Sequence, residues 1–319
     1  MLCPTYDAST VRELLDYDGC IAAVREAMAE FTAAGTVQPL RQIMQLSPGR
    51  LFALMPGTLP EPQGFGAKVI TAFADPDAPG RTPHQGIVVL FDASSGAPVC
   101  IADAGEVTHI RTAAATAVAT DALARANATS LTIFGCGAQA RTHLRAIARV
   151  RSLERVTVWG RDAARASAFA SSMAAESGLD VRAEPDGATA AQADIICTVT
   201  GSPTPVLLGE WVAPGTHVNA VGSSHAGPVE VDTELVLASR YIADSRASAR
   251  AAAAELIVAR EAGALTDDHI VAEIGQVLLG QVAGRTGDLD ITFYKSLGHI
   301  VQDLAAVRYL HARAVTRND

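Results

Sequence analysis

The sequence feature that most constrains the fold is a glycine-rich segment near the middle of the chain. The apolar run LTIFG at 131–135 continues into Gly137 and Ala140, where a helical stretch begins. In such a segment the first glycine permits a tight turn, the second lets the backbone approach a pyrophosphate, and the third small residue lets the helix pack close to the sheet. The helix N-terminus then offers N–H groups and a positive dipole end to phosphates. Because a second strand follows about 20 residues later, the segment predicts a dinucleotide-binding βαβ unit.

The chain after this segment keeps alternating between apolar and helical stretches. Such alternation predicts βαβ units and a doubly wound parallel sheet of the Rossmann type. The apolar runs lie at 156–160, 193–200 and 216–222, and the helical stretches at 138–149 and 162–176. Residues 245–264 are alanine-rich and predict a helix, and a further helix is expected from about His269 to Leu279.

The first third of the chain has a different pattern. Helical segments are expected from about Val11 to about Ala33, and after Gly35 short apolar segments are separated by Gly, Pro or Asp, which predicts strands. An alanine-rich helix from Val107 to Arg125 leads toward the glycine-rich segment, and an amphipathic stretch at 296–314 closes the chain.

The length of the chain favours two domains. At about 150 residues for each domain, 319 residues correspond to two. We expect an α/β fold in which a Rossmann domain spans 117–291. A smaller α/β domain spans 1–116 and is completed by 292–319.

Composition excludes several classes of partner. A formal net charge of -9 argues against general binding of nucleic acid or of an anionic membrane surface. We find no run of about 18 uncharged apolar residues that would predict a transmembrane helix. The N-terminal segment carries acidic residues and no apolar core, so we do not expect a secretion signal.

The cysteines indicate the compartment. Five are present and widely scattered, without the close, repeated spacing of a disulfide framework or a zinc site. We therefore expect reduced thiols in a cytoplasmic protein. Asp288 and Asp290 resemble a metal-binding pair at first sight, but two carboxylates do not make a cation cage and a turn explains them better, so no metal is expected.

The end of the second strand of the βαβ unit selects the nucleotide. NAD-binding domains usually carry Asp or Glu there, which binds the ribose 2′-hydroxyl. This chain has Gly160, which leaves room, and Arg161, which can pair with a 2′-phosphate and stack on adenine. Asp162 could instead cap the following helix or take the acidic role. The pattern favours NADP(H), with NAD(H) as the alternative.

Several further segments, taken together with the glycine fingerprint, resemble the ornithine cyclodeaminase/mu-crystallin family. The resemblance runs from about residue 35 to the C-terminus. It implies a Rossmann domain, a dimerising α/β domain completed by the C-terminal helix, and nicotinamide chemistry at the α-carbon of an amino acid or cyclic imino acid. The segments that carry it are GCGAQA (135–140), GAKV (66–69), HQG (84–86), EVTHIRTAAATAVAT (106–120), NAVG (219–222) and TFYKSLGHIVQDLAA (292–306).

The resemblance also implies a substrate site. Arg41, Lys68 and Arg111 match the positions where the family places cations around the substrate carboxylate, and Met55 matches a position in the wall of that site. The residue types agree with this role, since arginine holds a carboxylate in bidentate geometry and lysine adds a point charge. Lys68 lies inside an apolar strand, where burial without a partner is costly.

Cofactor contacts are expected on both sides of the fingerprint. By resemblance, His84 lies near the nicotinamide and Lys295 near the cofactor at the domain junction. The complete set of residues expected to bind the cofactor is His84, Thr112, Gly135, Gly137, Ala138, Gln139, Gly160, Arg161, Thr200, Val221 and Lys295.

Two positions depart from the pattern of the ornithine-cyclising members. Those members carry an Asp as general base where this chain has Ser224, and an acidic residue where it has Ala53. Serine is a poor base without a partner. The neighbouring His225 could supply one, although adjacent side chains often point to opposite sides.

Simple reduction of an imine makes smaller demands on the site than cyclisation does. We therefore expect Lys68, Arg111 and Ser224 to serve an NADPH-dependent reductase of a cyclic imino acid, such as Δ1-pyrroline-2-carboxylate or Δ1-piperideine-2-carboxylate. Ornithine cyclodeaminase, alanine dehydrogenase-like oxidation and a non-catalytic NADPH-bound ligand-binding protein are the alternatives. By resemblance, the expected assembly is a homodimer.

Overall fold

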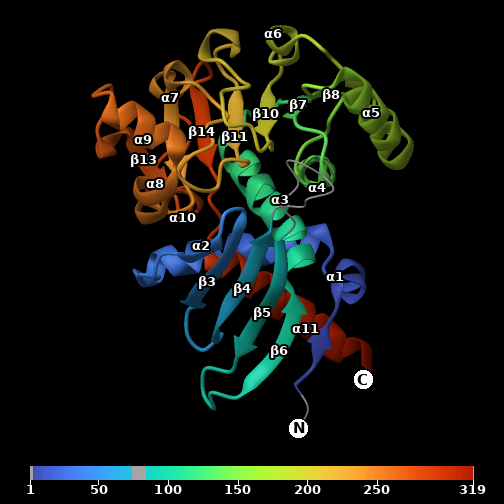
Figure 1. The fold of residues 1–319 in the computed structure, drawn as a ribbon, viewed down its shortest axis with the longest axis vertical. Coiled ribbons are helices and arrows are strands. Elements are labelled where there is room, and N and C mark those ends of the chain that lie inside the picture. Colours follow the sequence, from blue (N-terminus) through green and yellow to red (C-terminus); the bar gives the residue numbers. More distant parts are fainter. Residues whose placement is uncertain (1–2, 74–83, 319) are drawn as a thin grey trace. The chain divides into compact units, whose positions relative to one another are not determined.

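The computed structural model describes residues 3–73 and 84–318, and it divides the chain into two compact units (Figure 1). Unit 1 combines Met1–Ala114 with His299–Asp319, and unit 2 spans Ala115–Gly298. Helix α3 (Ala104–Leu123) runs across the boundary in the sequence. It begins three residues before the expected helix, directly after the last strand of unit 1.

Unit 1 is an α/β unit with a six-stranded sheet. The strand order is β1-β6-β5-β4-β3-β2, antiparallel from β2 to β6, with β1 parallel to β6. The elements are β1 (Thr5–Tyr6), α1 (Ala8–Leu14), α2 (Tyr17–Ala34), β2 (Gln42–Ser47), β3 (Arg50–Thr58), β4 (Phe65–Phe73), β5 (His84–Phe91), β6 (Pro98–Asp103) and α11 (Ile300–Asn318).

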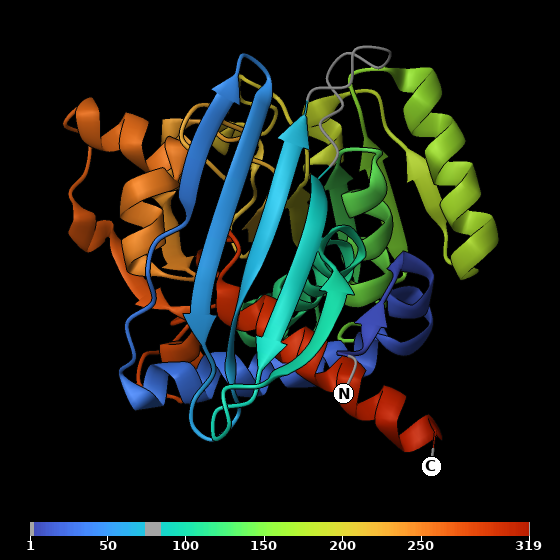
Figure 2. The ribbon, with the colours of Figure 1, turned by 60° about the horizontal axis from the view of Figure 1, so that its bottom comes forward.

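One face of this sheet packs against α11, which in turn packs on α2, and Figure 2 shows both helices behind the strands. Side chains alternate between the two faces of a strand. On β4, Lys68, Ile70 and Ala72 are therefore buried together on one face, while the residues between them are less buried. The row that crosses the sheet through Lys68 joins Met55 on β3 to Val88 on β5.

Unit 2 contains the parallel sheet expected from the alternating sequence pattern. Its eight strands are parallel throughout, in the order β13-β12-β14-β11-β10-β7-β8-β9. The elements are β7 (Ser130–Phe134), α4 (Ala138–Ile147), β8 (Arg155–Trp159), α5 (Ala163–Ser177), β9 (Val181–Ala183), α6 (Gly187–Ala190), β10 (Ile195–Thr198), η1 (Gly209–Trp211), β11 (His217–Ala220), α7 (Thr233–Ala238), β12 (Ser239–Ala243), α8 (Arg246–Ala252), α9 (Ala254–Glu261), η2 (Asp267–His269), β13 (Ile270–Glu273), α10 (Ile274–Leu278) and β14 (Ile291–Lys295).

Both faces of the parallel sheet carry an apolar core. Ile195 and Cys197 of β10 pack in one buried cluster with residues of β7, α4 and α5, whereas Ile196 packs in the other with residues of α7 and α9. The order of the strands around β7 is that of two mononucleotide-binding halves, with β7-β8-β9 on one side and β10-β11 on the other. In such sheets ligands bind outside the carboxyl ends of the strands, where the order reverses. Here that point lies between β7 and β10.

Two sequence expectations differ from the structure. Residues 292–298 were assigned with the first domain, but they lie in unit 2, because β14 pairs with β11 and β12 in the parallel sheet. The expected helix from His269 to Leu279 was wrong in its first half. Ile270–Glu273 form the edge strand β13, which pairs with β12, and only Ile274–Leu278 are helical. A stretch as short as these four residues acquires strand geometry from its neighbour rather than from its own propensity.

Candidate active-site residues

A buried group of charged side chains lies on the covered face of the unit 1 sheet. Lys68 Nζ on β4 lies 3.1 Å from Asp303 Oδ1, and Arg111 Nε on α3 lies 2.9 Å from the same oxygen. Arg111 Nη1 also donates to Gln302 Oε1 at 2.8 Å. Lys68 and Arg111 are each 3% exposed and Asp303 is fully buried. We call Lys68, Arg111 and Asp303 the cation cluster.

The cation cluster carries more positive than negative charge. Burial lowers the pKa of Lys68 to about 8, with Asp303 opposing this effect and the positive charges of Arg111 and Arg41 adding to it. Burial by itself would raise the pKa of Asp303, but Arg111 and Lys68 outweigh it and hold that pKa below its usual value. Two cations therefore share one carboxylate in a buried site. Such an arrangement is stabilised by a further anion.

Arg41 and Met55 lie on the same part of the sheet. Arg41 is half-buried and directly precedes β2, whose first residue, Gln42, pairs with Leu54. Met55 is buried and pairs with Lys68 across β3 and β4, so both side chains point to the same face. The structure thus brings together the four residues that the sequence assigned to substrate binding.

The glycine-rich turn of unit 2 has the form expected for phosphate binding. Gly135 has a φ of 132°, and a Cβ built there would lie 2.9 Å from Val199 Cγ2 and 3.0 Å from Val199 O. Only glycine fits such a position. Gly137 is the N-cap of α4 and provides no side-chain capping bond, so the cap residue leaves the first N–H groups of the helix available. Ala140 is fully buried in the core beneath.

Gln139 offers a polar group that a dinucleotide could use at this turn. Its Oε1 is buried and has no hydrogen-bond partner in the described part of the chain. Buried polar groups are nearly always paired. This turn combines the N-terminus of α4, a position at Gly135 that only glycine fits, and the amide oxygen of Gln139. Together these features suit the pyrophosphate and ribose of a dinucleotide.

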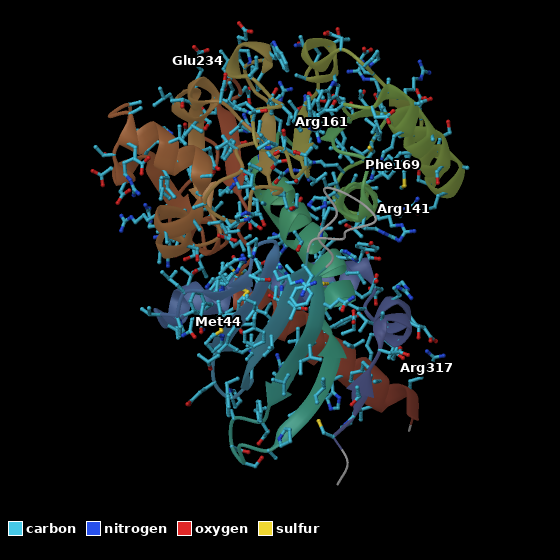
Figure 3. All side chains as sticks on the ribbon, viewed as in Figure 1. Met44, Arg141, Arg161, Phe169, Glu234 and Arg317 are labelled. Atoms are coloured by element: carbon cyan, nitrogen blue, oxygen red, sulfur yellow. The ribbon has the colours of Figure 1, made fainter. Side chains whose placement is uncertain are left out.

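The end of β8 resolves the role of Asp162. Its side chain accepts from the backbone N–H of Arg165 at 3.0 Å and caps α5. Arg161, labelled in Figure 3, follows the carboxyl end of β8 and is exposed, and Gly160 beside it is half-buried. Arg161 and Asp162 are both exposed at this turn, and the cap accounts for one oxygen of the Asp162 carboxylate.

The loops after β10 and β11 carry the remaining expected residues of unit 2. Thr200 follows β10, and Val221 and Ser224 follow β11. Ser224 is half-buried, with its backbone N–H donated to Gly222 O at 3.2 Å, and His225 is exposed. Both loops therefore leave the sheet at the edge where parallel sheets bind ligands.

Comparison with known proteins agrees with this geometry. A family model described as the ornithine cyclodeaminase/mu-crystallin family matches residues 5–318. The chain belongs to this family.

Relatives with assigned activities cover nearly the whole chain. A Δ1-pyrroline-2-carboxylate reductase of Bacillus cereus is 34% identical over 313 residues, which is 97% of this chain and 96% of that protein. The structure of Δ1-pyrroline-2-carboxylate reductase from Thermococcus litoralis in complex with NADH and L-proline has a TM-score of 0.94 and 27% identity, covering 99% of this chain and 98% of the other. An archaeal alanine dehydrogenase dimer with bound NAD has a TM-score of 0.93 and 28% identity, covering 100% and 98%.

The two departures from the ornithine-cyclising members of the family have structural consequences. Ala53 is buried on β3, two residues from Met55 and hence on the same face as Lys68. That position presents a methyl group, whereas the resemblance leads us to expect an acid there in an ornithine-cyclising enzyme. Ser224 presents a hydroxyl in the loop after β11. Neither position can neutralise the second ammonium group of a diamino acid.

Lys295, which we expect near the cofactor, is surrounded by protein acceptors. It is fully buried, and its ammonium group donates to Ser223 O at 2.8 Å, Ser223 Oγ at 3.1 Å and Glu255 Oε2 at 3.0 Å. An ammonium group has three protons, and all of them have protein acceptors. A cofactor contact by Lys295 would therefore be indirect.

Thr112 and His84, also expected to contact the cofactor, lie on α3 and β5, and Asp290 lies in a turn. Thr112 is buried on α3. His84 begins β5, and its side chain lies outside the described residues. The carboxylate of Asp290 accepts from Thr286 N, Thr286 Oγ1 and Gly287 N, which closes a turn before β14.

Sequence reasoning missed the acidic and amide members of the cluster. Asp303 and Gln302 lie on α11, and in the described chain Asp303 Oδ2 and Gln302 Nε2 are buried without hydrogen-bond partners. His299 lies nearby, and burial lowers its pKa to about 4, so it is neutral at pH 7 and adds no cation. The sequence did contain a sign that Asp303 is buried. It is three residues after Ile300 and four before Val307, which places it on the apolar side of the helix.

Proposed function

We propose that this protein is an NAD(P)H-dependent reductase of cyclic imino acids such as Δ1-pyrroline-2-carboxylate. The observation that carries the proposal is the cation cluster, in which Lys68 and Arg111 share the single carboxylate of Asp303. A substrate carboxylate supplies the missing negative charge, with Arg111 as a directional donor and Lys68 as a point charge. Arg41 adds to the positive potential, and Met55 gives the ring an apolar wall.

The dinucleotide-binding features of unit 2 supply the other half of the proposal. The α4 N-terminus and Gln139 hold the pyrophosphate region, and Thr200, Val221 and Ser224 line the second half of the nucleotide site. When bound, the reduced nicotinamide supplies a hydride for the imine carbon. The substrate nitrogen takes up one proton from the solvent, so that the C=N bond becomes CH–NH and the nicotinamide is left oxidised. The protein holds the acid in place, and Ser224 is within the loop suited to orient the reacting group.

Ala53 and Ser224 favour reduction over ornithine cyclisation. Cyclisation must hold a second ammonium group and move protons to and from it, and carboxylates do both. A cyclic imino acid has neither requirement, so an apolar side chain at position 53 and a hydroxyl at position 224 suffice. The relatives that reduce Δ1-pyrroline-2-carboxylate support the same choice.

Arg161 favours NADPH as the reductant. Its exposed guanidinium at the end of β8 can pair with a 2′-phosphate, and Asp162 uses one carboxylate oxygen to cap α5. NADH stays the competing cofactor, because the related solved structures hold NADH or NAD. The ratio of kcat/KM for NADPH and NADH tests this choice.

We further infer a cytoplasmic homodimer that assembles through the unit 1 sheet. β2 exposes Ile43 (51%), Met44 (61%) and Leu46 (51%), and Figure 3 shows Met44 on that strand. An exposed apolar strand favours association with a second copy. The related archaeal alanine dehydrogenase is a dimer.

The cysteines support the proposed cytoplasmic location, since all five are free, as in proteins of reducing compartments. In the described residues, the helices are too short or too polar to span a membrane.

The test is an absorbance assay at about 340 nm with the purified protein. We expect oxidation of NADPH with Δ1-pyrroline-2-carboxylate, and no reaction of NAD⁺ with ornithine or alanine at a comparable rate. Release of ammonia from ornithine would replace the proposal with cyclodeamination, and reduction of NAD⁺ by alanine would replace it with alanine oxidation. Tight binding of NADPH without turnover of any of these compounds would indicate a binding protein.

A further inference from the structure

Ser223, the residue before Ser224, is held from two sides by buried ionisable groups. Its backbone N–H donates to Glu230 Oε2 at 3.2 Å. Its carbonyl oxygen and hydroxyl oxygen both accept from Lys295 Nζ. Ser223 is 1% exposed, and Glu230 and Lys295 are fully buried. We call Ser223, Glu230, Lys295 and Glu255 the loop anchor.

Glu230 ties together the ends of two neighbouring strands. Beyond β10 it accepts from Thr200 N at 2.6 Å and Thr200 Oγ1 at 2.8 Å, and within β10 from Thr198 Oγ1 at 3.0 Å. Beyond β11 it accepts from Gly222 N at 2.7 Å in addition to Ser223 N. Five donors point at its two oxygens. A carboxylate suits this position because it only accepts, whereas a glutamine amide would direct two N–H donors at other donors.

Gly222 shows how closely the two loops approach each other. A Cβ built at Gly222 would collide with the backbone oxygen of Thr200 and would lie 2.5 Å from Glu230 Oε1. The loops after β10 and β11 are therefore packed backbone against backbone, with the Glu230 carboxylate closing the gap between them.

Lys295 fixes the same loop from the opposite side. It ends β14, which pairs with β11, and its third proton goes to Glu255 Oε2. Tyr241 OH donates to the other oxygen of Glu255 at 2.8 Å. The position of Lys295 is thus set by α9 and β12 as well as by its own strand. A rigid support of this kind holds a loop in one conformation.

We propose that Glu230 and Lys295 are positioning residues that set the loops of Thr200 and Ser224 for the nicotinamide half of the dinucleotide. The inference rests on the proposed function and deepens it. The fingerprint on β7 and the end of β8 serve the pyrophosphate and the adenine ribose, so the other half of the dinucleotide lies toward β10 and β11. The loop anchor acts only on that half.

The experiment compares the complete dinucleotide with a fragment that lacks nicotinamide. Binding of NADPH is followed by its fluorescence, and binding of 2′-phospho-ADP-ribose by calorimetry, for the full-length wild type, Glu230→Gln and Lys295→Met. We expect both variants to raise the Kd for NADPH about tenfold, a loss equal to about 1.4 kcal/mol, while the Kd for the fragment changes less than about threefold. With Δ1-pyrroline-2-carboxylate, kcat falls about tenfold and KM for the imine changes little.

Asp194→Asn is the matched control. Asp194 is a carboxylate with several donors, Thr129 N, Ser130 N and Ser130 Oγ among them, at the amino ends of β7 and β10. It lies in the same sheet at the opposite end of the strands. Its substitution costs stability in a similar way, but it leaves the affinities for NADPH and for the fragment unchanged.

Equal weakening of NADPH and the fragment would overturn the proposal, because a general loss of structure acts on both. Wild-type affinity for NADPH in a folded Glu230→Gln protein would overturn it as well. If Glu230→Gln does not fold, Ser223→Ala removes only the hydroxyl acceptor of Lys295, and the same difference between NADPH and the fragment is expected at about threefold. A wild type that binds NADPH but reduces no imine would refute the proposed function, while the binding comparison would still decide this inference.

Discussion

Two buried lysines, Lys68 and Lys295, have similar sequence surroundings but differ in the partners that the structure gives them. Each lies in an apolar strand and pairs with a buried carboxylate. In the described chain the ammonium group of Lys68 donates to one acceptor, Asp303, and shares it with Arg111. Lys295 donates to three acceptors and has Glu230 as well as Glu255 nearby.

The difference lies in the balance of charges and acceptors. The cation cluster has two cations for one carboxylate, so it is suited to bind a further anion. The loop anchor satisfies its lysine completely, so it is suited to hold the backbone in place. Burial alone identifies neither role, and the count of partners around each ammonium group separates them.

The largest effect is expected from removing the charge of Lys68. Lys68→Met should lower kcat/KM for the imine about a thousandfold, because losing one partner of a buried charge pair costs about 4 kcal/mol. KM should rise and the Kd for NADPH should stay near the wild-type value. Lys295→Met should give the reverse pattern, with weaker NADPH binding and little change in the imine KM. Steady-state kinetics and fluorescence titration of both variants measure these constants. If Lys68→Met and Lys295→Met changed them in the same way, the proposed difference between the two lysines would be wrong.

Removing the shared carboxylate should destabilise the cation cluster. Asp303→Asn leaves two buried cations without a counterion, and we expect the free energy of unfolding to fall by about 3 kcal/mol. Glu255→Gln should cost less, because Lys295 keeps both acceptors on Ser223. Urea denaturation at pH 7 measures both. A larger loss of unfolding free energy for Glu255→Gln than for Asp303→Asn would contradict the claim that the cation cluster depends more on its carboxylate than Lys295 does.

The pH dependence of substrate binding should follow Lys68. Its pKa is lowered to about 8, so its positive charge is lost as the pH rises through that value. KM for the imino acid should therefore rise above about pH 8, by at most tenfold for each pH unit, and level off where Arg111 holds the carboxylate alone. Stability has the opposite sign. Between pH 8 and pH 10.5, the pKa that Lys68 has before burial, the unfolded chain binds more protons, so the free protein becomes more stable.

The variant Lys68→Met is the control for this profile. It removes the titrating group, so its KM should show no rise near pH 8. An unchanged rise in that variant would assign the titration to another group.

The smallest effect is expected at an exposed cation of the nucleotide site. Arg161→Ala should raise the Kd for NADPH about fivefold, because a solvent-exposed guanidinium contributes less than a buried one. The Kd for NADH should change less than about twofold. Fluorescence titration with both nucleotides measures the difference, with Arg165→Ala as a neighbouring control. Equal changes for NADPH and NADH would remove the assignment of Arg161 to a 2′-phosphate.

The sequence by itself determined the features that depend on short stretches of chain. The strand, the glycines and the helix of residues 131–147 are contiguous, so Gly135, Gly137 and Ala140 predicted both the local geometry and the parallel sheet around it. Lys68 was recognisable because a charge inside an apolar strand needs a partner. Residues 269–279 were misread because Ile270–Glu273 form an edge strand only through pairing with β12.

Only the tertiary structure decided what the buried charges do. Asp303 is 235 residues from Lys68 in the sequence, Glu255 is 40 from Lys295, and Glu230 is 32 from Thr198. The role of a buried charge depends on the sum of its partners, and packing of distant segments sets that sum. The sequence could therefore indicate that Lys68 and Lys295 matter, whereas the partners that the fold brings to each are the basis for proposing one as a binding group and the other as a support.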